Sequence, residues 1–146
     1  MSPTQEQFER VLRYLNRMER KGATEEDRDD MFAFFLNCWH LCDWVANDAS
    51  VGRRLETVQL DAKAFSSLAS CELIANGSKH LVLTRPPRPT PHITHADVHA
   101  WDGADDRPAE ASYTFSFGSG SEDALTLARH AVADWRILLA RYGVAV

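Results

Sequence analysis

The stretch that decides the fold is TEEDRDDMFAFFLNCWHLCDWVAN, residues 24–47. It opens with a helix-start pattern, because the Thr24 hydroxyl caps free backbone N–H groups and the Asp27 carboxylate favours the positive end of the helix dipole. Its apolar residues recur at helical spacing in two stripes. One stripe holds Met31, Phe34, Phe35, Cys38, Leu41, Cys42 and Val45, and the other holds Phe32, Leu36 and Trp39. A helix apolar on two sides is either surrounded within its own chain or buries a face in a partner, and the second alternative predicts a homodimer.

Two further helices are predicted on either side of this segment. The first covers about residues 3–20, where Pro3 suits a first helical turn and apolar residues follow at helical spacing. After a connector at residues 49–59, another helix covers about residues 61–81. Short connections between consecutive helices favour antiparallel neighbours, so these helices are expected to pack side by side.

Extended chain is predicted after the third helix. Prolines at 86, 87, 89 and 91 stop any helix. Residues 92–101 and 111–117 then alternate between apolar and polar side chains, as half-buried strands do. A linker rich in turn-forming residues separates the two stretches, which together predict a β-hairpin.

A last helix is expected over about residues 121–142, because Ser119 and Glu122 have the spacing of a capping box. The predicted fold class is therefore mainly α. It is an up-down four-helix bundle with a β-hairpin inserted before the last helix, at about residues 90–118. A chain of 146 residues suits one compact domain, so residues 1–146 are expected to form a single helical-bundle domain.

Composition narrows the class of partner. The net charge of −5 argues against broad phosphate binding, and no DNA partner is expected. Cys38, Cys42 and Cys71 are the only cysteines, and an odd number inside apolar helical patterns indicates reduced core thiols. The first seven residues are polar and no apolar run approaches the roughly 20 residues of a membrane span, so a cytoplasmic protein without a membrane partner is expected.

Polar residues interrupt the second helix. Asn37, His40 and Trp44 follow the spacing i, i+3, i+7 and share one face, with Asp43 next to it. A histidine there suits acid–base chemistry, because its pKa lies close to neutrality. A buried polar network that only fixes how the helices fit together is the structural alternative.

A second polar set is predicted near the end of the third helix, formed by Asn76, Lys79 and His80. If the second and third helices pack antiparallel, the two polar sets meet. The predicted catalytic roles are His80 as acid or base, Lys79 as stabiliser of negative charge and Asn76 as the orienting group. His40 and Asp43 are the predicted supporting groups.

The sequence ANGSKH at residues 75–80 resembles the Arg-Asn-x-x-x-His motif of HEPN domains. Asn76 and His80 match the motif, and Ala75 stands where the family has arginine, which leaves Lys79 as the nearby cation. Together with NCWHLCDW at residues 37–44, this segment also resembles small uncharacterised bacterial proteins. The HEPN resemblance implies a small helical bundle, often homodimeric, that binds or cleaves RNA in a defence or toxin–antitoxin setting.

Two functions of other classes stay open. A non-catalytic dimeric interaction module would use its buried polar cluster only for structure. A metal-dependent enzyme would use the hairpin, where His95, Asp97 and His99 fall on one face of a strand, although an exposed polar face is the preferred interpretation. The chain contains no nucleotide-binding or zinc-binding motif, so no cofactor and no metal are expected.

Overall fold

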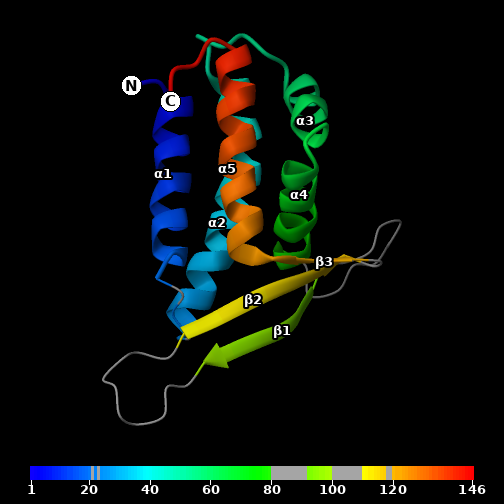
Figure 1. Cartoon of the computed structure of the whole chain (residues 1–146). Helices are drawn as coiled ribbons and strands as arrows, with labels where there is room; N and C mark the ends of the chain where they lie inside the picture. The colour runs from blue at the N-terminus through cyan, green and yellow to red at the C-terminus, as the bar shows by residue number, and fades with distance from the viewer. Residues whose placement is uncertain (21, 23, 80–91, 100–109, 118–119) are drawn as a thin grey trace.

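The computed structural model describes residues 1–20, 22, 24–79, 92–99, 110–117 and 120–146. Within these residues the chain is mainly helical, and the helices stand side by side with a small sheet across one end (Figure 1). The helices are α1 (Pro3–Met18), α2 (Glu25–Asn47), α3 (Leu55–Lys63), α4 (Ser66–Lys79) and α5 (Ala124–Arg141). The strands are β1 (His92–His99), β2 (Glu110–Phe117) and β3 (Gly120–Asp123).

The first two helices begin where the sequence predicts. The Ser2 hydroxyl accepts a hydrogen bond from the Gln5 backbone N–H and opens α1 with a capping box. Thr24 does the same for α2, where its hydroxyl accepts from the Asp27 backbone N–H at 3.1 Å. The Asp27 carboxylate in turn accepts from the Thr24 backbone N–H. These reciprocal bonds satisfy backbone donors that have no partner inside the helix, which confirms the predicted start of α2.

The predicted third helix is wrong in one respect, because it is two helices. Its first half, α3, starts within the predicted connector at 49–59, and Arg54 precedes it without a side-chain cap. The chain turns at Ala64 and Phe65, and the Phe65 backbone N–H donates to Ala62 three residues back instead of four. The half-buried Phe65 ring packs against the core, so the turn buries an aromatic side chain. The predicted count of four helices is therefore replaced by five among the described residues.

The predicted hairpin before the last helix is confirmed. Strands β1 and β2 pair antiparallel, with Ile93 opposite Phe115 and Val98 opposite Ala111. A short third strand, β3, adds to the other side of β2, which gives the order β1-β2-β3.

Strand β3 corrects the predicted start of the last helix. Glu122 pairs with Phe115 in the sheet and therefore is not the third residue of a capping box. Helix α5 begins at Ala124, and its cap is Asp123, whose carboxylate accepts from the Thr126 backbone N–H at 2.8 Å. Strand pairing up to residue 123 therefore moves the cap four positions along the chain, from Ser119 to Asp123.

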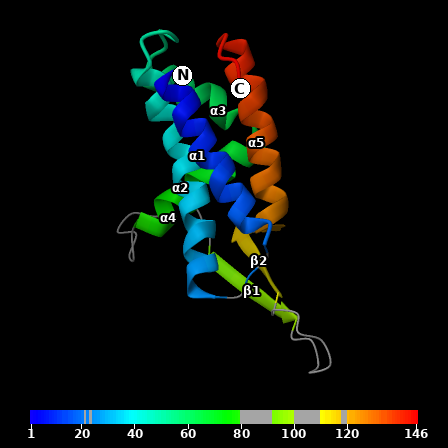
Figure 2. The same cartoon turned by 90° about the vertical axis from the view of Figure 1, so that its left-hand side faces the viewer.

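Helix α2 lies at the centre of the core. It contacts α1, α3, α4 and α5, and the whole first apolar stripe is buried inside the chain. Trp135 of α5, which is fully buried, donates its indole N–H to the Cys38 carbonyl of α2 at 3.0 Å. Helix α1 runs alongside α2 (Figure 2). Of the two alternatives for this helix, burial within its own chain is the one observed, and homodimerisation stays a prediction that does not depend on the stripe.

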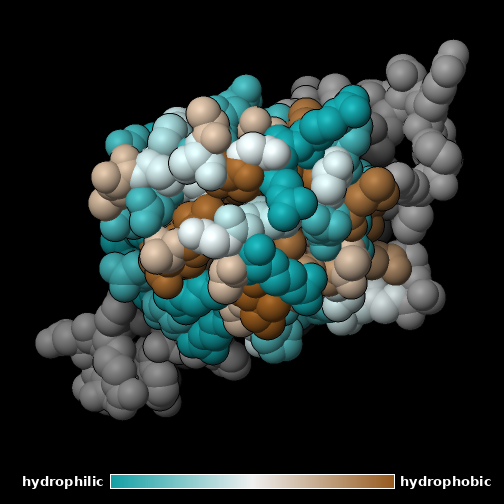
Figure 3. Space-filling view, turned by 90° about the horizontal axis from the view of Figure 1, so that it is seen from above, coloured by the Kyte–Doolittle hydropathy of each residue, from teal (hydrophilic) through white to brown (hydrophobic). Residues whose placement is uncertain are grey.

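The outer surface is mixed in character. Seen from the end that carries both termini, apolar side chains show as separate patches among hydrophilic ones (Figure 3). In the described part of the chain, no helix is both long enough and apolar enough to pass through a bilayer.

A polar surface on α1 and α2 as the candidate functional site

The polar face of α2 meets α1. Gln7, which is 1% exposed, donates its amide N–H group to the Asn37 carbonyl at 3.1 Å and lies 3.2 Å from the Asn37 side-chain oxygen. Arg10, one turn along α1, donates to the Gln7 side-chain oxygen at 2.9 Å. A chain of hydrogen bonds therefore runs from the half-buried Arg10 side chain into the contact between the two helices.

The same arginine lies over an aromatic ring. The Arg10 guanidinium carbon is 5.5 Å from the centroid of the Trp44 ring, a cation–π arrangement. Both side chains are half-buried. The Gln7 bond and the Trp44 ring fix the position of a charge that would otherwise move freely on a long stem.

His40 and Asp43 lie on the outward side of α2. Cys38 faces α4, because its sulfur is 3.8 Å from the sulfur of Cys71. Two residues further along an α-helix, the side chain has turned by about 200°, so His40 lies roughly opposite the face that contacts α4. His40 is half-buried and engaged in an interaction within the fold, while Asp43 is exposed. We name the surface formed by Arg10, Asn37, His40, Asp43 and Trp44 the His40 surface.

Only part of the second predicted set is described. Asn76 is exposed on α4, and Lys79 is the last residue of that helix, with its side chain outside the described part. His80 lies outside the described residues. The Cys38–Cys71 contact marks where the helices approach each other, and Asn76 lies about 7.5 Å beyond it along α4. The predicted meeting of the two polar sets therefore stays a prediction.

The burial of residue 75 explains why this chain has alanine where the HEPN motif has arginine. Ala75 is 1% exposed and belongs to the core cluster, so position 75 points inward between helices. A guanidinium there would have to be taken out of water into a closed apolar core, which costs several kcal/mol. The cation that the motif places at this position therefore has no room in this fold.

The clearest pKa shifts occur in the core and at a helix junction. Burial is the largest cause that raises the pKa of the Cys42 and Cys71 thiols. At the α2 end, hydrogen bonds from Ser50 and Thr4 hold the pKa of the Asp48 carboxyl well below its usual range. These groups stabilise the scaffold that carries the His40 surface, and they lie outside it.

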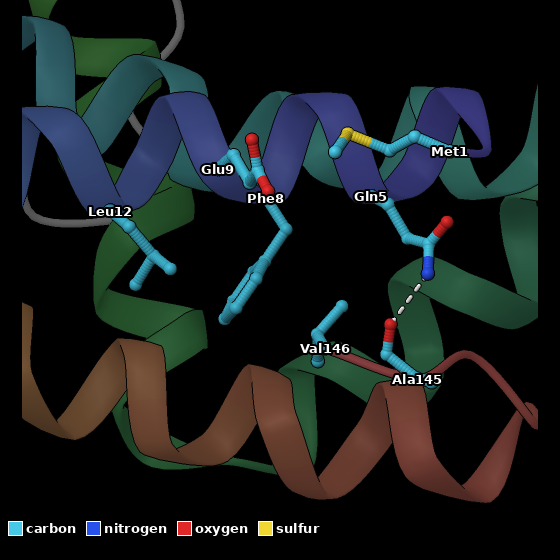
Figure 4. Close-up of a pocket in the computed structure, with 7 residues that line it drawn as sticks. All are labelled: Met1, Gln5, Phe8, Glu9, Leu12, Ala145 and Val146. Carbon is cyan, nitrogen blue, oxygen red and sulfur yellow. Dashed lines mark hydrogen bonds between the residues drawn. The ribbon is translucent and has the colours of Figure 1, made fainter.

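A groove of about 430 Å³ opens between α1 and the C-terminal segment. Phe8, Leu12 and Val146 supply its apolar walls, and the Gln5 amide donates to the Ala145 carbonyl at 2.7 Å across one end (Figure 4). The groove lacks a cluster of convergent polar groups. It is therefore a weaker candidate for chemistry than the His40 surface.

The metal alternative gains no support from the side chains that are described. Among them, no three histidine, cysteine, aspartate or glutamate residues are grouped so that they could hold a metal ion. The backbone of β1 places His95, Asp97 and His99 opposite Thr114, Ser112 and Glu110. The side chains of β1 lie outside the description, so the hairpin site stays a prediction.

Sequence analysis did not identify Arg10, which belongs to the His40 surface, or Gln7, which lies beneath that surface and supports it. The signal for Gln7 was present, because Thr4, Gln7, Phe8 and Val11 form one stripe and a polar residue inside an apolar stripe needs a buried partner. No comparable signal marked Arg10, which is one of thirteen arginines.

No family model matches this chain, and no curated protein or solved structure matches it at a significant level. The proposal that follows is therefore argued from the geometry of the described residues.

Proposed function

We propose that this chain is a HEPN-like helical domain that binds single-stranded RNA on the His40 surface and cleaves it without a metal ion. The observation that carries the proposal is the Arg10 guanidinium of α1, which lies over the ring of Trp44. Trp44 is one helical turn after His40 on α2. Arginine and aromatic rings together bind single strands, because the cation contacts phosphate and the ring stacks on a base.

The position of each group suits a step of RNA cleavage. A neutral His40 imidazole would accept the proton of a ribose 2′-hydroxyl, and the 2′-oxygen would attack the adjacent phosphorus. The bond from phosphorus to the 5′-oxygen then breaks and leaves a 2′,3′-cyclic phosphate. The departing 5′-oxygen takes up a proton and becomes a 5′-hydroxyl. Arg10 would stabilise the added negative charge on the phosphate oxygens. Asp43, three residues after His40 on the same helix, is the predicted supporting group.

The overall charge limits the size of the contact. With a net charge of −5 and a single fixed arginine, this surface suits one or two phosphates. Each phosphate neutralised on a single strand contributes a slope of about −0.7 in log K against log salt. A slope between about −0.7 and −1.4 is therefore expected, well below that of a protein with an extended basic surface.

The test measures binding and cleavage of a fluorescent single-stranded RNA in the presence of EDTA. Arg10→Ala is expected to weaken binding about tenfold or more, and His40→Ala to abolish cleavage while the far-ultraviolet circular dichroism is retained. The matched controls are Arg28→Ala and His130→Ala. Arg28 is an exposed arginine on α2, about 18 Å before His40 along the helix axis, and His130 is an exposed histidine on α5. Both controls are expected to bind and cleave like the parent.

Three outcomes would contradict the proposal. They are the absence of RNA binding, equal losses in Arg10→Ala and Arg28→Ala, and cleavage that survives His40→Ala. If His80→Ala alone abolishes cleavage, the predicted set of Asn76, Lys79 and His80 carries the chemistry and the His40 surface does not.

A second function is favoured by the bonds of Gln7. This buried amide contacts both the carbonyl and the side chain of Asn37, which is how a polar group fixes the fit between two helices. A non-catalytic interaction module needs only that structural role. It predicts that Gln7→Leu and Asn37→Ala lower the melting temperature, and that His40→Ala changes neither RNA affinity nor any cleavage.

A further inference from the structure

Three free cysteines meet at the interface between α2 and α4. Cys38, Cys42 and Cys71 are each 0% exposed. The Cys38 and Cys71 sulfurs are 3.8 Å apart, although the residues are separated by 33 positions in the sequence. The contact therefore joins the central helix to α4, two helices later in the chain, where α4 crosses α2 (Figure 2).

The pair differs from the third cysteine in a way that matters for chemistry. Cys71 donates its S–H to the Cys38 sulfur, so Cys38 is the acceptor of the pair. Burial, and after it that hydrogen bond, raises the pKa of the Cys71 thiol. Cys42 lies one turn from Cys38 on the same helix, and two cysteines four residues apart on a helix do not reach disulfide geometry readily.

We propose that Cys38 and Cys71 form an oxidative modification site, in which a peroxide converts the pair to a disulfide that locks α4 onto α2. The sulfurs have to approach by about 1.8 Å to reach bonding distance, a movement of the size that a side-chain rotation provides. Cys42 stays a free thiol in the oxidised protein.

The reaction balances with hydrogen peroxide as the oxidant. The Cys38 thiolate attacks one peroxide oxygen, the O–O bond breaks, and Cys38 becomes a sulfenic acid while the other oxygen leaves as water after protonation. The Cys71 sulfur then attacks the Cys38 sulfur and releases a second water. Two thiols lose two electrons in total, and one peroxide gains them.

Burial sets the rate of this modification. The reactive form is the thiolate, which is scarce inside a closed apolar core, so oxidation proceeds when α4 opens transiently from α2. We expect the oxidation rate to rise at urea concentrations below the unfolding transition, which promote local opening but leave the fold intact. The lock therefore responds to oxidant and to the stability of the α2–α4 contact together.

The experiment treats the full chain with hydrogen peroxide, blocks remaining thiols under denaturing conditions and maps linked peptides by mass spectrometry without reduction. The number of free thiols is expected to fall from three to one, with Cys38 and Cys71 in one linked peptide pair. The melting temperature is expected to rise by about 5–10 °C and to return after dithiothreitol, because the new bond closes a 33-residue loop.

Cys42→Ala is the matched control, since it removes a thiol from the same buried cluster and is expected to keep the link. Cys71→Ala is expected to lose it. If Cys71→Ala does not fold, the peptide map of the parent and of Cys42→Ala still decides the question. Three thiols that persist after treatment, a link that includes Cys42, or a link that Cys42→Ala abolishes would each overturn the proposal.

Discussion

At the scale of single residues, the burial of Ala75 explains why the resemblance to the HEPN motif is incomplete. The motif places its arginine at a position that here points into the core, 1% exposed, while the next residue, Asn76, is exposed. The two neighbouring positions therefore differ sharply in what they tolerate. Ala75 is the only mismatch at the motif's three defined positions, and it is the one that the fold itself accounts for.

Restoring the arginine is expected to damage the fold. Ala75→Arg adds a large charged side chain to a closed core and should reduce the free energy of unfolding by about 3 kcal/mol or more. Asn76→Arg adds the same side chain to an exposed position and should change it by less than about 0.5 kcal/mol. Urea denaturation of both variants checks the difference, and equal losses would show that position 75 is not enclosed as described.

Asp48 is expected to make the stability depend on pH. It accepts hydrogen bonds from the Ser50 hydroxyl at 2.6 Å and from the Thr4 backbone N–H at 3.2 Å, which favour the charged form and lower the pKa of its carboxyl. A carboxyl whose folded pKa is depressed stabilises the fold fully above its unfolded value near pH 4, and this contribution is lost as the pH falls through the folded pKa.

Asp48→Asn tests this contribution. We expect the parent to exceed the variant in stability by about 1–2 kcal/mol at pH 7, and this difference to shrink as the pH falls from 5 to 2. Urea midpoints measured at several pH values give the result. A difference that stays constant over that range would mean that the Asp48 charge contributes nothing.

At the scale of elements, the start of α5 shows how a local pattern was overridden by strand pairing. Ser119 and Glu122 match a capping box in sequence, yet Glu122 bonds into the sheet and Asp123 caps the helix. Asp123→Ala is expected to lower the free energy of unfolding by about 1 kcal/mol, as loss of an N-cap does. Glu122→Ala, one residue earlier and exposed, is expected to lower it by less than about 0.5 kcal/mol, and thermal melts of both variants compare them.

The elements that the sequence predicted well are those with local chemical signals. Thr24 and Asp27 define the start of α2, and the alternating chain on either side of a turn-rich linker defines the hairpin. The turn at Ala64 and Phe65 carries neither glycine nor proline, and it follows from where Phe65 packs. Only tertiary contacts could have predicted that division.

The candidate site was predicted less well for a related reason. Asn37, His40 and Trp44 were correctly placed on one helix face. A helix with two apolar sides does not reveal which neighbour each side meets, so the sequence did not predict that Asn37 and Trp44 contact α1. Their observed partners, Gln7 and Arg10, lie on α1.

At the scale of the whole molecule, one aromatic residue attaches the sheet to the helices. Phe115 of β2 is 1% exposed, and its ring centroid lies 5.3 Å from Phe35 and 6.3 Å from Phe32, both on α2 and both edge-to-face. Such pairs add to the free energy gained by burying the rings. The sheet therefore belongs to the same core as the helices.

Phe115→Ala is expected to lower the free energy of unfolding by about 3–5 kcal/mol, because it leaves a cavity between the sheet and α2. Ser112→Ala, exposed on the same strand, should change it by less than about 0.5 kcal/mol. Chemical denaturation of both variants, followed by tryptophan fluorescence, measures the two effects. A small loss for Phe115→Ala would mean that the sheet folds independently of the helices.

The enclosure of α2 by the rest of the chain also determines how fast its backbone amide hydrogens exchange with solvent. The other four helices all pack against α2. The amides in the middle of α2 are therefore exposed to solvent only when these helices separate together. Deuterium should therefore enter the segment around Cys38 last, at a rate set by complete unfolding, and much earlier at the outer ends of α1 and α3. The centre of this one helix then serves as an internal gauge of the stability of the entire chain.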